Sequence, residues 1–234
     1  MDQVLTVTDE GAVRVLTLNR PGQRNALDRE LLRALGETVA EAEREPGVHV
    51  VVLTGTPPAF CAGLDLRAIT RPDWDPEDWD RVYRAFQSLT TPTIAAVNGA
   101  ASTAGLGLVL GCDFAVAAAT ASFADMHARV GLLSASGMSA ALADRIGLAR
   151  AKEMWLTARP IDASRAYQWG IVNDVVPAGD LEASVRARAH LIADRDPDYV
   201  GTLLATHNAG RQATLQSHIA LERRAAAEWL SARA

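Results

Sequence analysis

The sequence of 234 residues has little of several features that mark specialised classes of protein. It has only two cysteines, Cys61 and Cys112, which stand apart in apolar surroundings, so we expect neither a disulfide scaffold nor a cysteine metal site, and a reduced cytoplasm fits best. It has no long hydrophobic run and no basic-then-apolar leader, which predicts neither a membrane span nor export. The formal charge is −5 with both signs interspersed, which argues against nucleic acid and an anionic membrane surface as partners.

What the sequence does have is apolar patterning. Hydrophobic residues make up 49% of the chain, enough for one large core in a single enzyme-sized unit. A strand is predicted in "VRVLTLNR", closed by Pro21 and Gly22. Asp28 is a plausible N-cap for a following helix, whose apolar positions recur at three- and four-residue spacing up to Ala42.

Three further strands are predicted in unbroken apolar runs, "VHVVVLTG", "TIAAVNG" and "CDFAVAA". Runs without alternation indicate burial on both faces, as in a parallel sheet. Beyond residue 140 the pattern is helical apart from a short strand in "GIVNDVVP". This order predicts an α/β core with right-handed crossovers and a helical C-terminal part.

Two loops rich in small residues follow predicted strands, "TGTPPAFCAGLDL" and "NGAASTAGLGL". Small residues allow backbone N–H groups to approach a ligand, and each loop runs toward a helix whose first turn has free N–H groups. Either loop alone fits an ordinary turn that needs glycine. Together they can converge on one acceptor oxygen and polarise it, which predicts an oxyanion hole.

Five separated segments, in order, resemble the crotonase (enoyl-CoA hydratase/isomerase) superfamily over about residues 4–178: "RPGQRNALD", "VVVLTGTPPAFCAGLDL", "TPTIAAVNGAASTAGLGLVLGCDFAVA", "ASFADMHARVGLL" and "LTARPIDASRAYQWGIVNDVVP". The resemblance implies a spiral of ββα units with a helical C-terminal region. It divides the chain into a core of residues 1–180 and a helical region of residues 181–234, shortened relative to the family, which suggests a more open site. It also implies a homotrimer or a dimer of trimers.

The same resemblance implies a substrate and a site. The substrate is an acyl thioester of coenzyme A or of a carrier protein, whose carbonyl is held by the backbone N–H groups of Leu64 and Ala104. Asp65 and Asp113 resemble structural acids of the family. Neither a metal nor a redox cofactor is expected, because metal-ligand spacing and a dinucleotide fingerprint are both missing. The implied substrate-binding positions are Arg24, Ala62, Leu64, Asp65, Leu66, Arg67, Gly105 and Gly107.

The chain departs from the family at the positions of proton transfer. A hydratase resembling this sequence would carry glutamates where Gly107 and His127 stand. Hydration needs groups that take and deliver protons, and glycine can do neither. His127 is then the candidate proton-transfer group, because histidine titrates near physiological pH, and Asp125 could orient or replace it. The alternative for His127 is a loop histidine satisfied by hydrogen bonds.

Two classes of function stay open. One is an enzyme that stabilises a thioester enolate, with hydratase/isomerase, decarboxylase or cyclase chemistry. A dehalogenase is excluded, because the aspartate nucleophile expected from the resemblance would fall at Ala135. The other is a protein that binds acyl-CoA and has lost catalysis. The intact loops favour the first class, and Gly107 favours the second.

Overall fold

The strands form two sheets in a computed structural model that describes residues 3–232, with the side chains of all of these except 212–217. The larger sheet has the order β1-β2-β3-β5-β7-β10, parallel except for β1. Its strands are β1 (Leu5–Glu10), β2 (Val13–Leu18), β3 (Val50–Gly55), β5 (Thr93–Val97), β7 (Phe114–Ala118) and β10 (Asp174–Val176). The smaller sheet consists of β4 (Ala59–Cys61), β6 (Ala100–Ser102), β8 (Ser122–Ala124) and β9 (Ile161–Asp162).

Successive turns of the chain repeat one unit, in which a strand of the larger sheet leads into a strand of the smaller sheet and then a helix. The units are β3-β4-α2, β5-β6-α3 and β7-β8-α4. The expected spiral of ββα units is therefore confirmed. The helices are α1 (Arg29–Ala42), α2 (Pro76–Ser88), α3 (Ala104–Gly111), α4 (His127–Val130), α5 (Met138–Ile146), α6 (Leu148–Thr157), α7 (Ala163–Trp169), α8 (Leu181–Ala193) and α9 (Pro197–Ser231), with 3₁₀ turns at Pro21–Gln23 and Ala178–Asp180.

The local patterns account for most of these elements. Asp28 does cap α1, because its carboxylate accepts a hydrogen bond of 2.9 Å from the Leu31 N–H. The unbroken apolar run at 50–55 is β3, which pairs in parallel with a strand on each side. The three-residue strands β4, β6 and β8 were not predicted, since they lie inside segments interpreted as loops and are too short to carry a periodic pattern.

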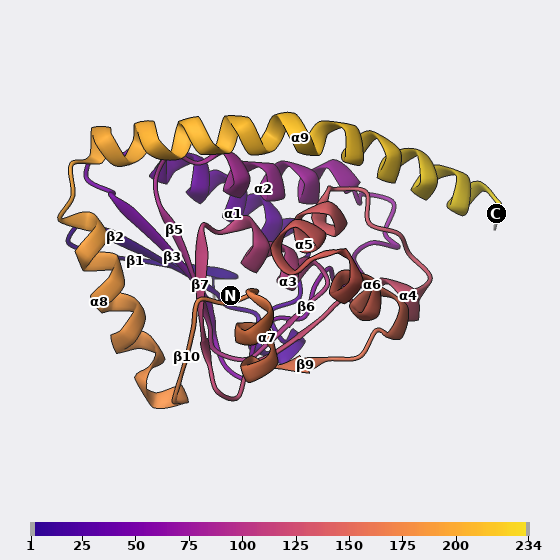
Figure 1. Cartoon of the computed structure of the whole chain (residues 1–234), viewed down its shortest axis with the longest axis horizontal. Coiled ribbons are helices and arrows are strands. Elements are labelled where there is room, and N and C mark those ends of the chain that lie inside the picture. The colour runs from indigo at the N-terminus through magenta and orange to yellow at the C-terminus, as the bar shows by residue number, and fades with distance from the viewer. Residues whose placement is uncertain (1–2, 233–234) are drawn as a thin grey trace.

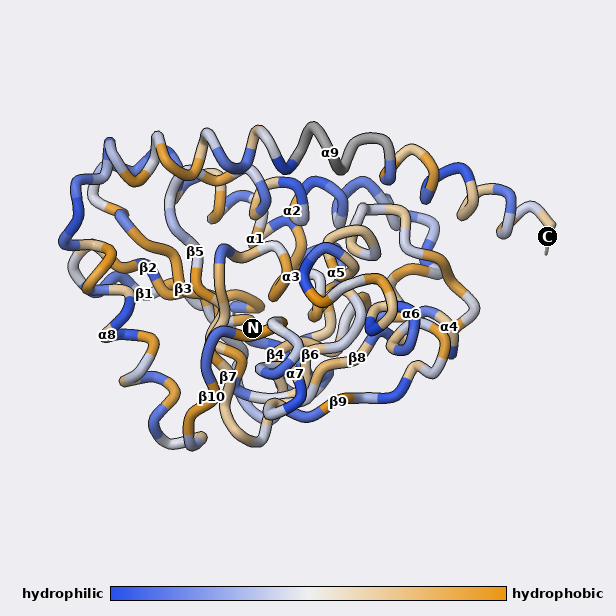
Figure 2. The backbone as a smooth tube through the Cα atoms, viewed as in Figure 1, coloured by the Kyte–Doolittle hydropathy of each residue, from blue (hydrophilic) through white to orange (hydrophobic). Residues whose placement is uncertain are grey.

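The core lies on both faces of the larger sheet. One face packs on α1, α2 and α3, and every residue of α3 is buried. The other face is covered by α8. The strands in the middle of the molecule and α3 are largely hydrophobic in Figure 2. The long helix α9 runs across the top of α2 and on toward α5 (Figure 1). None of the helices in residues 3–232 combines the length and the apolar composition that crossing a membrane requires.

Candidate functional site: two backbone donors beside a histidine–aspartate pair

The two loops identified in the sequence lie in direct backbone contact. They follow β4 and β6, which are neighbouring parallel strands. A Cβ atom on Gly105 would lie only 2.1 Å from the Cys61 carbonyl oxygen, so a larger residue there would force the two backbones apart. Gly63 has a φ of +102°, and a Cβ atom on it would lie 2.9 Å from the Ser102 oxygen and 3.5 Å from the Ala104 nitrogen. These two glycines allow the loops to meet.

Each loop contains a backbone N–H group at a position that the family resemblance singled out, Leu64 in the first loop and Ala104 in the second. Ala104 is the first residue of α3, so its N–H lies in the unbonded first turn of the helix. Leu64 forms a parallel bridge with Leu27, in which Leu27 N–H donates to the Gly63 oxygen and Asp65 N–H donates to the Leu27 oxygen. The Leu64 N–H therefore faces away from Leu27. Neither N–H has an acceptor among the described residues.

One expectation about the first loop was wrong. The loop after β4 does not run directly into a helix, because residues 66–70 form turns and α2 begins only at Pro76. Its free N–H arises from the parallel bridge between Leu27 and Leu64 and not from a helical first turn. The second loop does enter a helix, as predicted, and Thr103 at its start has a φ of +50°.

A buried polar network holds the first loop in place. Asn25 is fully buried with a φ of 56°, a conformation that asparagine tolerates well. Its Nδ2 donates to the carbonyl oxygens of Thr56 and Ala59 at 2.8 and 2.7 Å, and its Oδ1 accepts from the Arg20 N–H at 2.9 Å. Asn25 therefore joins the loop after β2 to the segment that leads into β4.

Asp65, directly after Leu64, has the contacts of a structural acid. The Arg20 guanidinium lies 3.2 Å from its carboxylate and 3.0 Å from that of Asp28. Burial alone would raise the pKa of Asp65, but hydrogen bonds from Arg67 N–H and Arg20, with the charge of Arg20, lower it overall. Asp113 lies at the other end of α3, where it accepts hydrogen bonds of 2.7 and 2.9 Å from Thr93 N and Oγ1.

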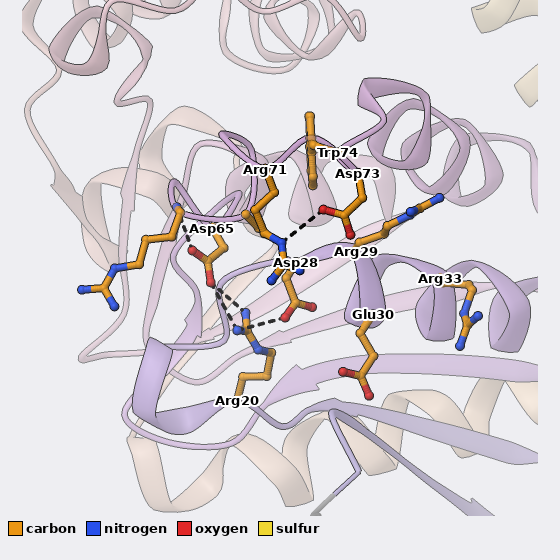
Figure 3. Close-up of a pocket in the computed structure, with 11 residues that line it drawn as sticks. Arg20, Asp28, Arg29, Glu30, Arg33, Asp65, Arg71, Asp73 and Trp74 are labelled. Carbon is orange, nitrogen blue, oxygen red and sulfur yellow. Dashed lines mark hydrogen bonds and ion pairs between the residues drawn. The ribbon is translucent and has the colours of Figure 1, made fainter.

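A cavity of about 590 Å³ opens beside Asp65 (Figure 3). Its ion pairs include Arg20 with Asp28 and Asp65, and Arg71 with Asp73. Arg67 also lines the cavity and has no carboxylate partner in the described part of the chain. The lining residues are Arg20, Asp28, Arg29, Glu30, Arg33, Asp65, Arg67, Ala68, Arg71, Asp73 and Trp74.

The other predicted binding residues surround the first loop. Ala62 and Arg24 are exposed neighbours, since Ala62 N–H donates to the Arg24 carbonyl oxygen at 3.0 Å. Leu66 is an exposed apolar side chain. Gly105 and Gly107 are instead buried inside α3. For these two, direct contact between a side chain and a ligand is impossible, and only their backbone and their small size can contribute.

His127 and Asp125 form a pair. His127 Nδ1 lies 2.7 Å from Asp125 Oδ1, which also accepts the His127 backbone N–H at 3.0 Å. The side chain of Asp125 is 1% exposed and that of His127 is 21% exposed. The pair follows β8, next to the donor loop, because Thr103 N–H donates to the Ala124 oxygen and Met126 N–H donates to Thr103 Oγ1.

Position 107 is filled by side chains from two other helices. A Cβ atom on Gly107 would lie 2.9 Å from the Trp79 ring and 3.1 Å from the Met138 sulfur. Trp79 comes from α2, and Met138 is the first residue of α5. The space next to position 107 is therefore apolar and occupied.

The sequence reasoning did not identify Asn25, Trp79 or Met138. A signal existed only for Asn25, a polar residue just before a helix cap in "RNALD". No group of three histidine, cysteine, aspartate or glutamate side chains in the described residues is close enough together to hold a metal ion.

Comparisons with known proteins agree with this architecture. The family profile for enoyl-CoA hydratase/isomerase matches residues 8–233. A probable peroxisomal enoyl-CoA hydratase 1 of Arabidopsis thaliana is 34% identical over 95% of this chain and 85% of its own length. Carnitinyl-CoA dehydratase of Proteus mirabilis is also 34% identical, over 95% of this chain and 87% of its own length.

Solved structures show the same fold. The crystal structure of an enoyl-CoA hydratase from Mycobacterium avium superposes with a TM-score of 0.90 at 39% identity and covers 98% of both chains. One from Mycobacterium smegmatis gives a TM-score of 0.89 at 37% identity, covering 99% of this chain and 100% of the other. The chain belongs to the enoyl-CoA hydratase/isomerase family.

Proposed function

We propose that this protein is an acyl-CoA-processing enzyme that holds the thioester carbonyl with the N–H groups of Leu64 and Ala104. The observation that carries the proposal is that Gly63 and Gly105 hold the two loops in backbone contact, and that the N–H groups of Leu64 and Ala104 in these loops have no acceptor among the described residues. Fixed donors aimed at developing negative charge stabilise an enolate oxygen without reorganisation. The names of relatives that act on CoA thioesters support the same substrate class.

The cavity beside Asp65 is the proposed site for the anionic part of the thioester. Five arginines and four acidic residues line it, and most of them pair with each other. Arg67 is unpaired among the described residues, and Arg33 has only a 3.8 Å contact with Glu37. Their guanidinium groups suit the phosphates of coenzyme A or the single phosphate of a carrier-bound pantetheine.

The proposed proton-transfer group is His127, oriented by Asp125. The buried carboxylate holds Nδ1, which fixes the ring orientation, and Nε2 has no partner among the described residues. One such base can take a proton from the carbon next to the carbonyl and return it to another carbon of the enolate. That chemistry fits isomerisation. Decarboxylation or cyclisation would use the same enolate, whereas hydration needs a second proton-transfer group, so we expect crotonyl-CoA hydration to be slow.

A second candidate is a protein that binds acyl-CoA without turning it over. The observation that favours it is the apolar filling at Gly107 by Trp79 and Met138. The two candidates differ in whether the enolate forms. Exchange of the α-protons of butyryl-CoA in D₂O measures this step directly and does not depend on which product the enzyme makes.

The experiment follows this exchange by NMR and, in parallel, butyryl-CoA affinity by calorimetry. Under the enzyme proposal the wild-type protein exchanges, and His127→Gln loses about a hundredfold to ten-thousandfold in rate with little change in affinity. His207→Gln, an exposed histidine on α9, is the matched control and keeps the wild-type rate. Binding without exchange selects the second candidate. Absence of binding to any CoA or carrier-protein thioester contradicts both.

The donor assignment has its own test. Proline is accepted at the first position of a helix, so Ala104→Pro removes the N–H while keeping the start of α3. Loss of one donor of this kind costs about a hundredfold to a thousandfold in rate. Circular dichroism checks the fold, because Thr103 before the new proline is restricted. A folded variant with full exchange activity would show that Ala104 is not a donor.

A further inference from the structure

Position 107 lies on the same face of α3 as the donor Ala104, one helical turn further along. A thioester oxygen on the Ala104 N–H would therefore bring its first acyl carbons close to whatever packs at Gly107. The atoms found there are Trp79 Cζ2 and Cη2, at 2.9 and 3.1 Å from a Cβ placed on Gly107, and Met138 Sδ at 3.1 Å. An indole edge and a thioether thus press directly on the α3 backbone.

Both side chains belong to the rigid interior. Trp79 is 7% exposed and stacks on the fully buried Tyr83, with ring centroids 5.3 Å apart. Met138 is 1% exposed. Because neighbours surround Trp79 on α2, a ligand cannot displace the indole without disturbing that stack.

Two adjacent residues of α9 bind α2, which contains Trp79, and α5, which contains Met138. Glu222 Oε2 accepts the Gly137 N–H at 2.8 Å, directly before Met138. Arg223 Nη2 lies 2.5 Å from the carboxylate of Asp80, directly after Trp79. The helix α9 passes over α2 and reaches α5 (Figure 1), so it fixes the spacing of the two side chains from outside.

We propose that Trp79 and Met138 are specificity-determining residues, which form the wall that limits the acyl group and restrict the site to short acyl chains. The inference rests on the proposed function, since it assumes that the thioester oxygen binds at Leu64 and Ala104. The glycine at position 107 makes room for this wall, because the Trp79 indole occupies the volume that a side chain at position 107 would need.

The test is a chain-length series of acetyl-, butyryl-, hexanoyl- and octanoyl-CoA, with affinities measured by calorimetry. In the wild-type protein the affinity stops rising beyond butyryl-CoA. In Trp79→Leu it continues to rise by about fourfold for each methylene that enters the opened space. Trp79→Phe gives a smaller extension, since it removes less of the wall.

Trp155→Leu is the matched control, because Trp155 is a partly buried tryptophan of α6 that packs on the core and is absent from the contacts of Gly107. It keeps the wild-type profile. If Trp79→Leu does not fold, Met138→Ala tests the same wall from α5. A folded variant of either residue that binds thioesters with the wild-type chain-length profile overturns the proposal, while the proposed function stands. A wild-type protein that binds no thioester overturns both.

Discussion

Gly105→Ala tests whether contact between the two loops sets the position of the donors. The added Cβ would lie 2.1 Å from the Cys61 carbonyl oxygen, 2.8 Å from the Cys61 carbonyl carbon and 2.9 Å from the Cys61 Cβ. A carbon atom normally approaches a carbonyl oxygen to about 3.3 Å. Cys61 belongs to β4 and Gly105 to α3, so the backbone of one of these two elements must move by about 1 Å.

That displacement has two expected consequences. Overpacking in a tight core costs about 1 to 3 kcal/mol of unfolding free energy, which lowers the Tm by about 2 to 4 °C for each kcal/mol in a protein of this size. A shift of about 1 Å in catalytic geometry lowers the rate by about a hundredfold. At 25 °C the variant is still folded, so its lower stability alone would barely change the rate of α-proton exchange. We therefore attribute the expected fall in rate to the displaced N–H groups.

Thermal unfolding and butyryl-CoA exchange in D₂O provide the two measurements. Gly210→Ala is the control, since Gly210 also lies within a helix but a Cβ there meets nothing within 4 Å. Alanine is the better helix former, so the control keeps its activity and gains stability. A Gly105→Ala protein with wild-type exchange rate and Tm would refute the view that close contact between the loops positions the donors.

Three further predictions concern the surroundings of the site. Burial raises the pKa of Glu222 in the folded protein, despite its hydrogen bonds from Gly137 and α5. The stability that the Glu222 carboxyl contributes is therefore fully present below its pKa in the unfolded chain, and it is lost as the pH rises through its pKa in the folded protein. Glutamine at position 222 stays neutral, so the Tm of Glu222→Gln should rise relative to the wild-type Tm as the pH goes from 4 to 7. A difference in Tm that does not change with pH would contradict the raised pKa of Glu222. Burial raises the pKa of the Cys61 thiol to about 12 and also raises that of Cys112, so neither reacts with a thiol reagent at pH 8 until the protein unfolds; rapid labelling of native protein would count against this burial. Asn25→Ala leaves the buried carbonyl oxygens of Thr56 and Ala59 without their donor, which costs about 1 to 3 kcal/mol for each group. We expect a Tm lower by more than about 5 °C. Asn19→Ala, which removes a more exposed amide, is the control.

Much of the candidate site followed from local chemistry. The glycines at 63 and 105 and the small residues beside them indicated close backbone approach, and the structure confirms the contact between the loops. The origin of the Leu64 donor could not be predicted in the same way. Its N–H is unpaired because residue 27, almost 40 positions earlier, forms the bridge that turns it outward, and no local pattern carries that information.

The amino-acid sequence by itself determined the buried strands, the cap of α1, the glycines that permit close packing and the absence of a carboxylate at position 107. Each of these depends on neighbours within a few residues, where periodicity and backbone preference act. Only the tertiary structure decided what fills the space at Gly107 and what holds it. Trp79, Met138 and the Glu222–Arg223 pair come from three helices, and side chains meet across helices only when the whole core packs into one shape.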